Sequence, residues 1–254
     1  IEKKNTCNMM GLCGSNLQPL LQKLVPSNES CNNLSFDANS NTSHSTFLTT
    51  NKKYPYPTQQ LAILSSLIMP LTLIVGPPGT GKTDTVGWSL AVLCENVCKI
   101  DHERIIITAH SNAALDQMVL RLLALYDSFA TSSTSSVSST SSASSWSPVI
   151  LRLGHTDSMN DTVSSRCSMP SLISSFSSSG HQRPRRQDIM ARANVIAMTV
   201  AGACLRRFSF KGTIGALVME EAAKITQPEA VALLSYNPQR VVMVGDPLQL
   251  APVI

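Results

Sequence analysis

Residues 76–83 carry the sequence Gly76-Pro77-Pro78-Gly79-Thr80-Gly81-Lys82-Thr83, which fits the phosphate-binding pattern G-x-x-x-x-G-K-[ST] at every specified position. Its glycines let the backbone curl so that successive N–H groups form an anion-binding concavity at a helix N-terminus. The Lys82 ammonium can then reach the β- and γ-phosphates of a nucleotide, and the Thr83 hydroxyl can bind Mg²⁺. The alternative is a plain Gly/Pro turn between a strand and a helix, and the flanking segments favour the phosphate loop.

Strand-like and helix-like segments alternate from Tyr54 onward. An apolar β-type run leads into the phosphate loop, and an apolar-periodic stretch leads out of it. The pattern predicts strands near 71–75, 104–108, 195–199, 214–219 and 240–244, and helices near 57–68, 82–94, 113–125 and 228–235. Together with the loop, this alternation predicts an α/β P-loop NTPase (RecA-like) fold. Its doubly wound, mostly parallel sheet would have helices on both faces.

Composition divides the chain of 254 residues into unequal parts. Residues 1–52 are rich in Asn, Ser and Thr without a sustained period, so we interpret them as a low-complexity linker or the remnant of an upstream domain. Residues 53–254 form the predicted nucleotide-binding domain. Residues from about 127 to 190 include two Ser-rich stretches, which bury too little apolar surface to offset the entropy of ordering. We therefore predict a disordered surface insertion, interrupted at 149–154 by a returning strand or another core segment.

Bulk properties narrow the possible partners. The net charge of +4 permits a nucleic-acid partner without arguing for one, because binding depends on a local basic patch. The seven cysteines are scattered, with no C-x-x-C pair, so reduced thiols are expected and neither a zinc site nor a disulfide framework follows. No apolar stretch is long enough to span a bilayer, so we expect no membrane partner.

Paired carboxylates follow the apolar run 216–219 directly, at Glu220 and Glu221. A phosphate loop that hydrolyses ATP needs one carboxylate on the metal side and a second that polarises the attacking water. Glu220 would serve as the metal-side acid and Glu221 as the general base. The alternative is an acidic helix start, since carboxylates favour helix N-termini.

Four further stretches resemble motifs of superfamily 1 helicases of the nonsense-mediated-decay type. Residues 244–252 resemble motif III, 111–117 resemble motif Ia, and 193–199 resemble the next nucleic-acid-contacting motif. Gln59 lies seventeen residues before Gly76, as does the adenine-contacting glutamine of the family. The resemblance covers about residues 54–254 and is strongest to the Aquarius-like branch of spliceosomal intron-binding helicases.

The resemblance implies a role for each matching residue. Gln59 would hydrogen-bond the adenine of ATP, and Gln249 would sense the γ-phosphate. Glu220 would hold Mg²⁺ together with Thr83. The phosphates would be bound by Gly76, Pro77, Pro78, Gly79, Thr80, Gly81, Lys82, Thr83 and Lys224. The backbone of single-stranded nucleic acid, RNA in preference to DNA, would contact Ser111, Asn112 and Thr199.

Two residues depart from the family pattern. Position 220 is Glu where Asp is commoner, which moves the carboxylate outward by one methylene. Position 224 is Lys where much of the family has Gln, which puts coupling to hydrolysis in question. A second motor domain with its arginines would lie beyond Ile254, so we expect this stretch alone to hydrolyse ATP poorly.

We therefore expect a first motor domain that couples ATP hydrolysis to 5′→3′ translocation. Spliceosomal or other ribonucleoprotein partners follow from the resemblance. Nuclear residence, with the cytoplasm as alternative, follows from it and from the basic cluster 183–186. The alternatives are a catalytically weak nucleotide-binding scaffold in a ribonucleoprotein complex and a different P-loop ATPase, such as a DNA-repair or transport motor.

Overall fold

The structure is a computed structural model that describes residues 55–99, 103–132, 146–177, 184–205 and 212–249. The chain divides into two compact units, Ile1–Gln60 and Leu61–Ile254. The predicted linker at 1–52 lies outside the described residues. The sheet and the two pockets discussed below belong to the second unit.

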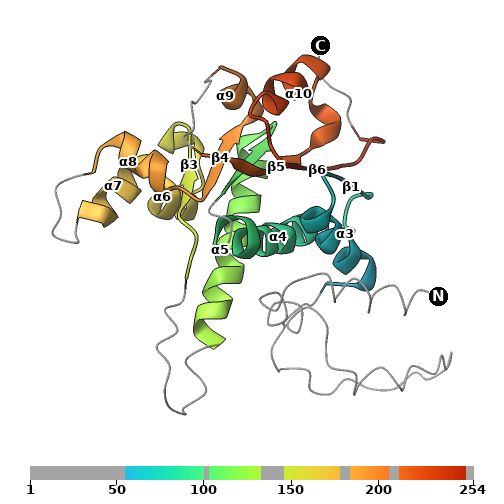
Figure 1. The fold of residues 1–254 in the computed structure, drawn as a ribbon, viewed down its shortest axis with the longest axis horizontal. Coiled ribbons are helices and arrows are strands. Elements are labelled where there is room, and N and C mark those ends of the chain that lie inside the picture. The colour runs from blue at the N-terminus through green and yellow to red at the C-terminus, as the bar shows by residue number, and fades with distance from the viewer. Residues whose placement is uncertain (1–54, 100–102, 133–145, 178–183, 206–211, 250–254) are drawn as a thin grey trace. The chain divides into compact units, whose positions relative to one another are not determined.

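A six-stranded parallel sheet forms the centre of the second unit, in the order β1-β6-β5-β2-β4-β3 (Figure 1). All five strands predicted from the sequence are present, and the apolar segment near 150 adds a short edge strand. Because the strand order departs from the chain order, parallel neighbours are joined by crossovers, as a doubly wound fold requires. The strands are β1 (Leu71–Val75), β2 (Arg104–Ala109), β3 (Ile150–Arg152), β4 (Val195–Thr199), β5 (Ile214–Glu220) and β6 (Arg240–Gly245).

Helices cover both faces of this sheet, as predicted. Figure 1 shows α4 and α5 on one side of the strands and α9 and α10 on the other. The even-numbered side chains of β2 and β4, such as Ile106 and Ile196, join a core with the second group of helices. Every residue of β5 is buried, as expected for a central strand covered on both faces. The longer helices are α3 (Pro57–Ile68), α4 (Lys82–Leu93), α5 (Asn112–Ser132) and α10 (Gln227–Leu234).

Shorter helical segments fill the remaining connections. These segments are the π-helical turn η1 (Cys94–Cys98), the 3₁₀ turns η2 (Thr156–Ser158) and η3 (Ala222–Lys224), and the helices α6 (Asp161–Cys167), α7 (Met169–Ser177), α8 (Arg186–Arg192) and α9 (Val200–Leu205). Within the described residues, no helix is long and apolar enough to cross a membrane.

The prediction of a disordered insertion over about 127–190 is wrong for much of that range. Helix α5 continues to Ser132, and α6, α7 and α8 follow β3. A few apolar residues at helical spacing are enough to anchor α7, since Met169 and Leu172, three positions apart, are both buried. Its serines bond back along the helix, and Ser174 Oγ donates to the carbonyl of Pro170 at 3.0 Å. Residues 133–145 and 178–183 lie outside the described residues, so the prediction stays untested there.

Candidate functional site

The register of the sheet gathers the predicted site residues at one edge. Thr199 on β4 and Glu220 on β5 both pair with Ala109 at the end of β2. On the other side of β5, Val75 at the end of β1 pairs with Gly245 at the end of β6. In a parallel sheet the carboxyl ends of all strands meet at one edge, where ligands of open α/β sheets bind. The phosphate loop, the paired acids and the nucleic-acid motifs therefore share this edge.

The phosphate loop has the backbone that its sequence predicts. Gly79 and Gly81 have φ values of 79° and 80°, in the left-handed region that favours glycine. A side chain at Gly76 would place its Cβ 2.8 Å from Thr80 Oγ1, so the loop also needs glycine for close approach. Gly81 is the N-cap of α4, and the loop therefore ends at the N-terminus of a twelve-residue helix, a favourable place for phosphate.

Lys82 is held against the loop by its own backbone. Its Nζ donates to the carbonyl of Gly76 at 2.6 Å and to that of Pro77 at 2.9 Å. These are neutral acceptors that a phosphate oxygen can replace with a stronger, charge-assisted bond. Thr83 follows on α4 and is exposed to solvent.

A pocket of about 140 Å³ lies beside this lysine. It brings together five of the residues predicted from the sequence. Gly76 to Thr80 and Thr83 are not among the residues that line it. The pocket is lined by Lys82, Glu220, Glu221, Ala223, Lys224, Gly245, Asp246 and Gln249.

Glu220 is the buried acid of this pocket, with 9% of its surface exposed. Burial, and to a lesser degree the charge of Glu221, raises the pKa of Glu220 to about 7, although the charge of Lys82 acts in the opposite direction. Its Oε2 is buried without a hydrogen-bond partner. A carboxylate in this position is costly unless a cation joins it, so the pocket favours a positively charged ligand group.

Glu221 is held in an unusual conformation. Its φ of 54° lies in the left-handed region, which is uncommon for a residue other than glycine and which marks functional or strained sites. Its Oε1 accepts a hydrogen bond from Lys224 Nζ at 2.7 Å, whereas its Oε2 is buried without a partner. The predicted general base is therefore paired with the very lysine that departs from the family pattern.

Asp246 is a site residue that the sequence analysis did not single out. It is buried, directly follows β6 and lines the pocket. Its Oδ2 accepts from Gln249 Nε2 at 3.1 Å, and its Oδ1 accepts from the Leu248 amide at 3.0 Å. Asp246 thereby positions the predicted γ-phosphate sensor. Asp246 could have been found from the sequence, because it is an acidic residue at the end of an apolar strand, as is Glu220.

The residues present fit Mg²⁺. The buried, unpartnered Oε2 atoms of Glu220 and Glu221 are hard oxygen ligands, the kind that Mg²⁺ prefers. Within the described residues, no group of three or more His, Cys, Asp or Glu is placed to hold a metal by itself. Mg²⁺ in nucleotide sites commonly takes one or two carboxylates from the protein and its other ligands from phosphates and water.

Gln59 belongs to the first compact unit, in the first turn of α3. Its Oε1 accepts a hydrogen bond from the amide of Tyr56 at 2.9 Å. Its predicted contact with adenine stays a prediction.

A second pocket, of about 240 Å³, opens near the ends of β2, β3 and β4. Asn112 and Thr199, two of the three residues predicted to contact nucleic acid, both line it. Ser111 is exposed and immediately precedes Asn112 at the start of α5. The structure therefore brings two of the three together and places the third beside them. The other lining residues are Arg152, Leu153, Gly154, His155, Ser158, Met198, Gly202 and Leu205.

Two hydroxyl groups at or beside this pocket are able to donate a hydrogen bond to a ligand. Ser111 Oγ accepts from the amide of Ala114 at 3.1 Å, and Thr199 Oγ1 accepts from the amide of Gly202 at 3.2 Å. Each hydroxyl uses a lone pair in this bond, so its O–H can still donate. Donors in this arrangement suit phosphate oxygens, which only accept.

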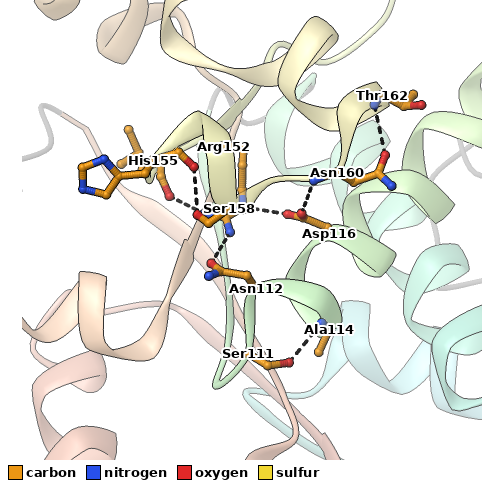
Figure 2. Close-up of polar contacts among 10 residues, drawn as sticks. Ser111, Asn112, Ala114, Asp116, Arg152, His155, Ser158, Asn160 and Thr162 are labelled. Carbon is orange, nitrogen blue, oxygen red and sulfur yellow. Dashed lines mark hydrogen bonds and ion pairs between the residues drawn. The ribbon is translucent and has the colours of Figure 1, made fainter.

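The sequence analysis also missed a buried ion pair behind this second pocket. Arg152 Nε donates to Asp116 Oδ1 at 2.9 Å, and Figure 2 shows the pair joining β3 to α5. Both residues lie in segments named above, 111–117 and 149–154. Patterns in a single sequence give no signal that two such residues, thirty-six positions apart, will meet.

Comparisons with known proteins agree with this architecture. A family model described as an AAA domain matches residues 56–183 and 166–254. The chain is 31% identical over 211 residues to a Schizosaccharomyces pombe protein named ATP-dependent helicase upf1, covering 77% of this chain and 22% of that protein. It is 30% identical over 229 residues to a Neurospora crassa regulator of nonsense transcripts 1 homolog, covering 82% and 20%.

A third relative is ATP-dependent helicase NAM7 of Saccharomyces cerevisiae, 28% identical over 200 residues, covering 77% of this chain and 20% of that protein. The chain thus spans about a fifth of the length of these curated relatives. Among solved structures, the UvsW helicase of bacteriophage T4 aligns with a TM-score of 0.47 at 15% identity, over 78% of this chain and 54% of that one.

Proposed function

Because this chain belongs to the AAA-domain family whose model matches most of its length, we propose that it is the first motor domain of a superfamily 1 helicase. In this proposal the domain binds ATP at the phosphate loop and single-stranded nucleic acid at the second pocket. The names of its relatives, two ATP-dependent helicases and a regulator of nonsense transcripts, support the proposal.

One observation carries the proposal: charged acids and a P-loop lysine line one pocket, and hydrogen-bond donors gather at another, along one edge of one sheet. Glu220 on β5 and Thr199 on β4 both pair with Ala109 of β2. The two sites are therefore separated by a single strand. If ATP turnover moves the end of one of these strands, the rigid backbone of the sheet can pass that movement to the other site.

The polar residues predicted from the sequence divide the tasks of hydrolysis among them. Lys82 leaves the carbonyls of the loop and binds the β- and γ-phosphates, where it offsets their charge. Glu221 orients the attacking water and accepts its proton as the bond to the γ-phosphate forms and the bond to ADP breaks. Mg²⁺ bound by Glu220 and Thr83 would neutralise charge on the phosphates. Gln249, held by Asp246, senses whether the γ-phosphate is present.

We extend the proposal to the whole protein on the basis of the motif resemblance. Its substrate is RNA in preference to DNA, its direction is 5′→3′, and its partners are spliceosomal or other ribonucleoprotein proteins. Its location is the nucleus, with the cytoplasm as the alternative. The support is the resemblance of residues 81–84, 110–112, 151–155, 196–199 and 219–223 to the Aquarius-like branch.

A second function has one specific observation in its favour. The ion pair between Lys224 and Glu221, at 2.7 Å, neutralises the general base in the nucleotide-free domain. A domain that keeps this pair after ATP has bound would hold nucleotide without turning it over. Such a protein would act as a nucleotide-dependent scaffold in a ribonucleoprotein complex.

ATP turnover by the full-length protein, measured with and without single-stranded RNA, separates the two functions. The helicase proposal predicts turnover that RNA stimulates, because the nucleic-acid site and the ATP site share one sheet edge. ATP binding without stimulation would refute the helicase and support the scaffold. Absence of ATP binding would refute both.

A further inference from the structure

Arg152 is a fully buried cation next to the proposed nucleic-acid pocket. Its side chain has no exposed surface, and three of its N–H groups have partners (Figure 2). Nε donates to Asp116 Oδ1 at 2.9 Å, Nη1 donates to the carbonyl of Leu153, and Nη2 donates to Asn112 Oδ1 at 2.7 Å. A buried charge needs partners of this kind, and a change in one partner disturbs the others.

The hydrogen bond to Arg152 fixes the orientation of the Asn112 side-chain amide, with its oxygen toward Arg152. A guanidinium has donors only, so the Asn112 atom that meets it must be the carbonyl oxygen. Figure 2 shows this oxygen at the Arg152 bond and the amide nitrogen turned elsewhere. Because Asn112 lines the pocket, its two N–H donors remain for a ligand. A flip of the amide would set its N–H groups against the buried cation, and this opposes the alternative orientation.

Asp116 in turn fixes Arg152. It is buried, and its second oxygen, Oδ2, accepts from the amide of Asn160 at 2.7 Å. Asn160 caps α6, since its Oδ1 accepts from the amide of Thr162 at 3.0 Å. The start of α6 therefore holds the Asp116 carboxylate, and Asp116 holds the guanidinium through a bond that does not involve Asn112.

We propose that Arg152, held by Asp116, is a positioning residue that presents Asn112 as an obligate hydrogen-bond donor to the phosphodiester backbone of single-stranded nucleic acid. This inference rests on the proposed function. The specific occupant is a phosphate oxygen, because the pocket offers N–H and O–H donors from Asn112 and Thr199, and a phosphate oxygen only accepts. Arg152 itself does not touch the ligand in this scheme, since it acts through Asn112.

The test is a double-mutant cycle on affinity for a fluorescent single-stranded oligouridylate, with affinity for a fluorescent ADP analogue as the control. Arg152→Lys keeps the charge but cannot reach all the partners of the guanidinium. We expect it to weaken RNA binding about tenfold, the equivalent of one charge-assisted hydrogen bond, and to leave ADP affinity unchanged. In an Asn112→Ala background, Arg152→Lys should have almost no further effect, because the group it positions is gone.

Asn112→Asp covers the case in which Arg152→Lys fails to fold. The aspartate keeps the bond to Arg152 and strengthens it, but it replaces the two donors with an anionic acceptor. RNA affinity should fall more than tenfold while stability to urea holds or rises.

Three outcomes overturn the inference. The first is equal losses from Arg152→Lys in both backgrounds, which would mark a purely structural role. The second is unchanged RNA affinity in Asn112→Asp. In the third, the wild-type chain binds ADP but not RNA, and the proposed function fails together with the positioning role.

Discussion

The raised pKa of Glu220 predicts that this buried carboxyl group destabilises the nucleotide-free domain at neutral pH. Burial raises this pKa from 4.5 to about 7. A pKa that is higher in the folded state means that folding favours the protonated carboxyl. The stability it contributes is fully present below pH 4.5 and is lost as the pH rises to 7 and above. At 1.36 kcal/mol for each pKa unit, the loss is about 3 kcal/mol at pH 8.

Glu220→Gln removes this titration while keeping the shape of the side chain. The amide has its own cost of burial, but that cost does not depend on pH. The informative quantity is therefore how the difference in unfolding free energy between variant and wild type changes with pH. From pH 5 to pH 8 this difference should move by about 2.5 kcal/mol in favour of the variant. Urea unfolding of the nucleotide-free chain at a series of pH values measures it.

Glu229→Gln is the matched control, because its shift has the opposite sign. The amide of Thr226 donates to the Glu229 carboxylate at 2.8 Å and lowers its pKa. Its stabilising effect is therefore present above pH 4.5 and is lost as the pH falls. Removing it should destabilise the chain at pH 8 and have little effect at low pH. Parallel pH curves for wild type and Glu220→Gln would refute the electrostatic argument for the acid pocket.

Four further predictions concern single residues. Lys82→Ala should abolish nucleotide binding without changing the circular dichroism spectrum, and unchanged ATP affinity would exclude the proposed pocket. Gly81→Ala should cost about 1–2 kcal/mol in urea unfolding, because φ is 80° there, and a fully stable variant would contradict the loop geometry. Lys224→Gln should release Glu221 and raise RNA-stimulated turnover, whereas a fall would mean that Lys224 serves the phosphates directly. Burial raises the pKa of the Cys167 thiol to about 11, so iodoacetamide should modify it far more slowly at pH 8 in folded than in unfolded chains. Equal rates would show that the thiol is accessible.

Local chemistry made most of the fold and the ATP pocket predictable. The phosphate loop needs glycine at positions with left-handed φ and a lysine at the helix start, and these requirements are written in consecutive residues. The paired acids lie at the end of a fully buried strand, so their position at the sheet edge could be inferred as well. Composition is a misleading guide at 161–177, because a count of serines hides the few apolar residues that anchor α7.

Only the tertiary structure decided which polar residues meet. The sequence by itself determined a phosphate-binding α/β domain, since motif spacing and apolar periodicity are local properties of the chain. The pairing of Arg152 with Asp116, and through it the orientation of Asn112, joins β3 to α5 across thirty-six positions. Such contacts depend on strand order and register, and these emerge only when the whole sheet has assembled.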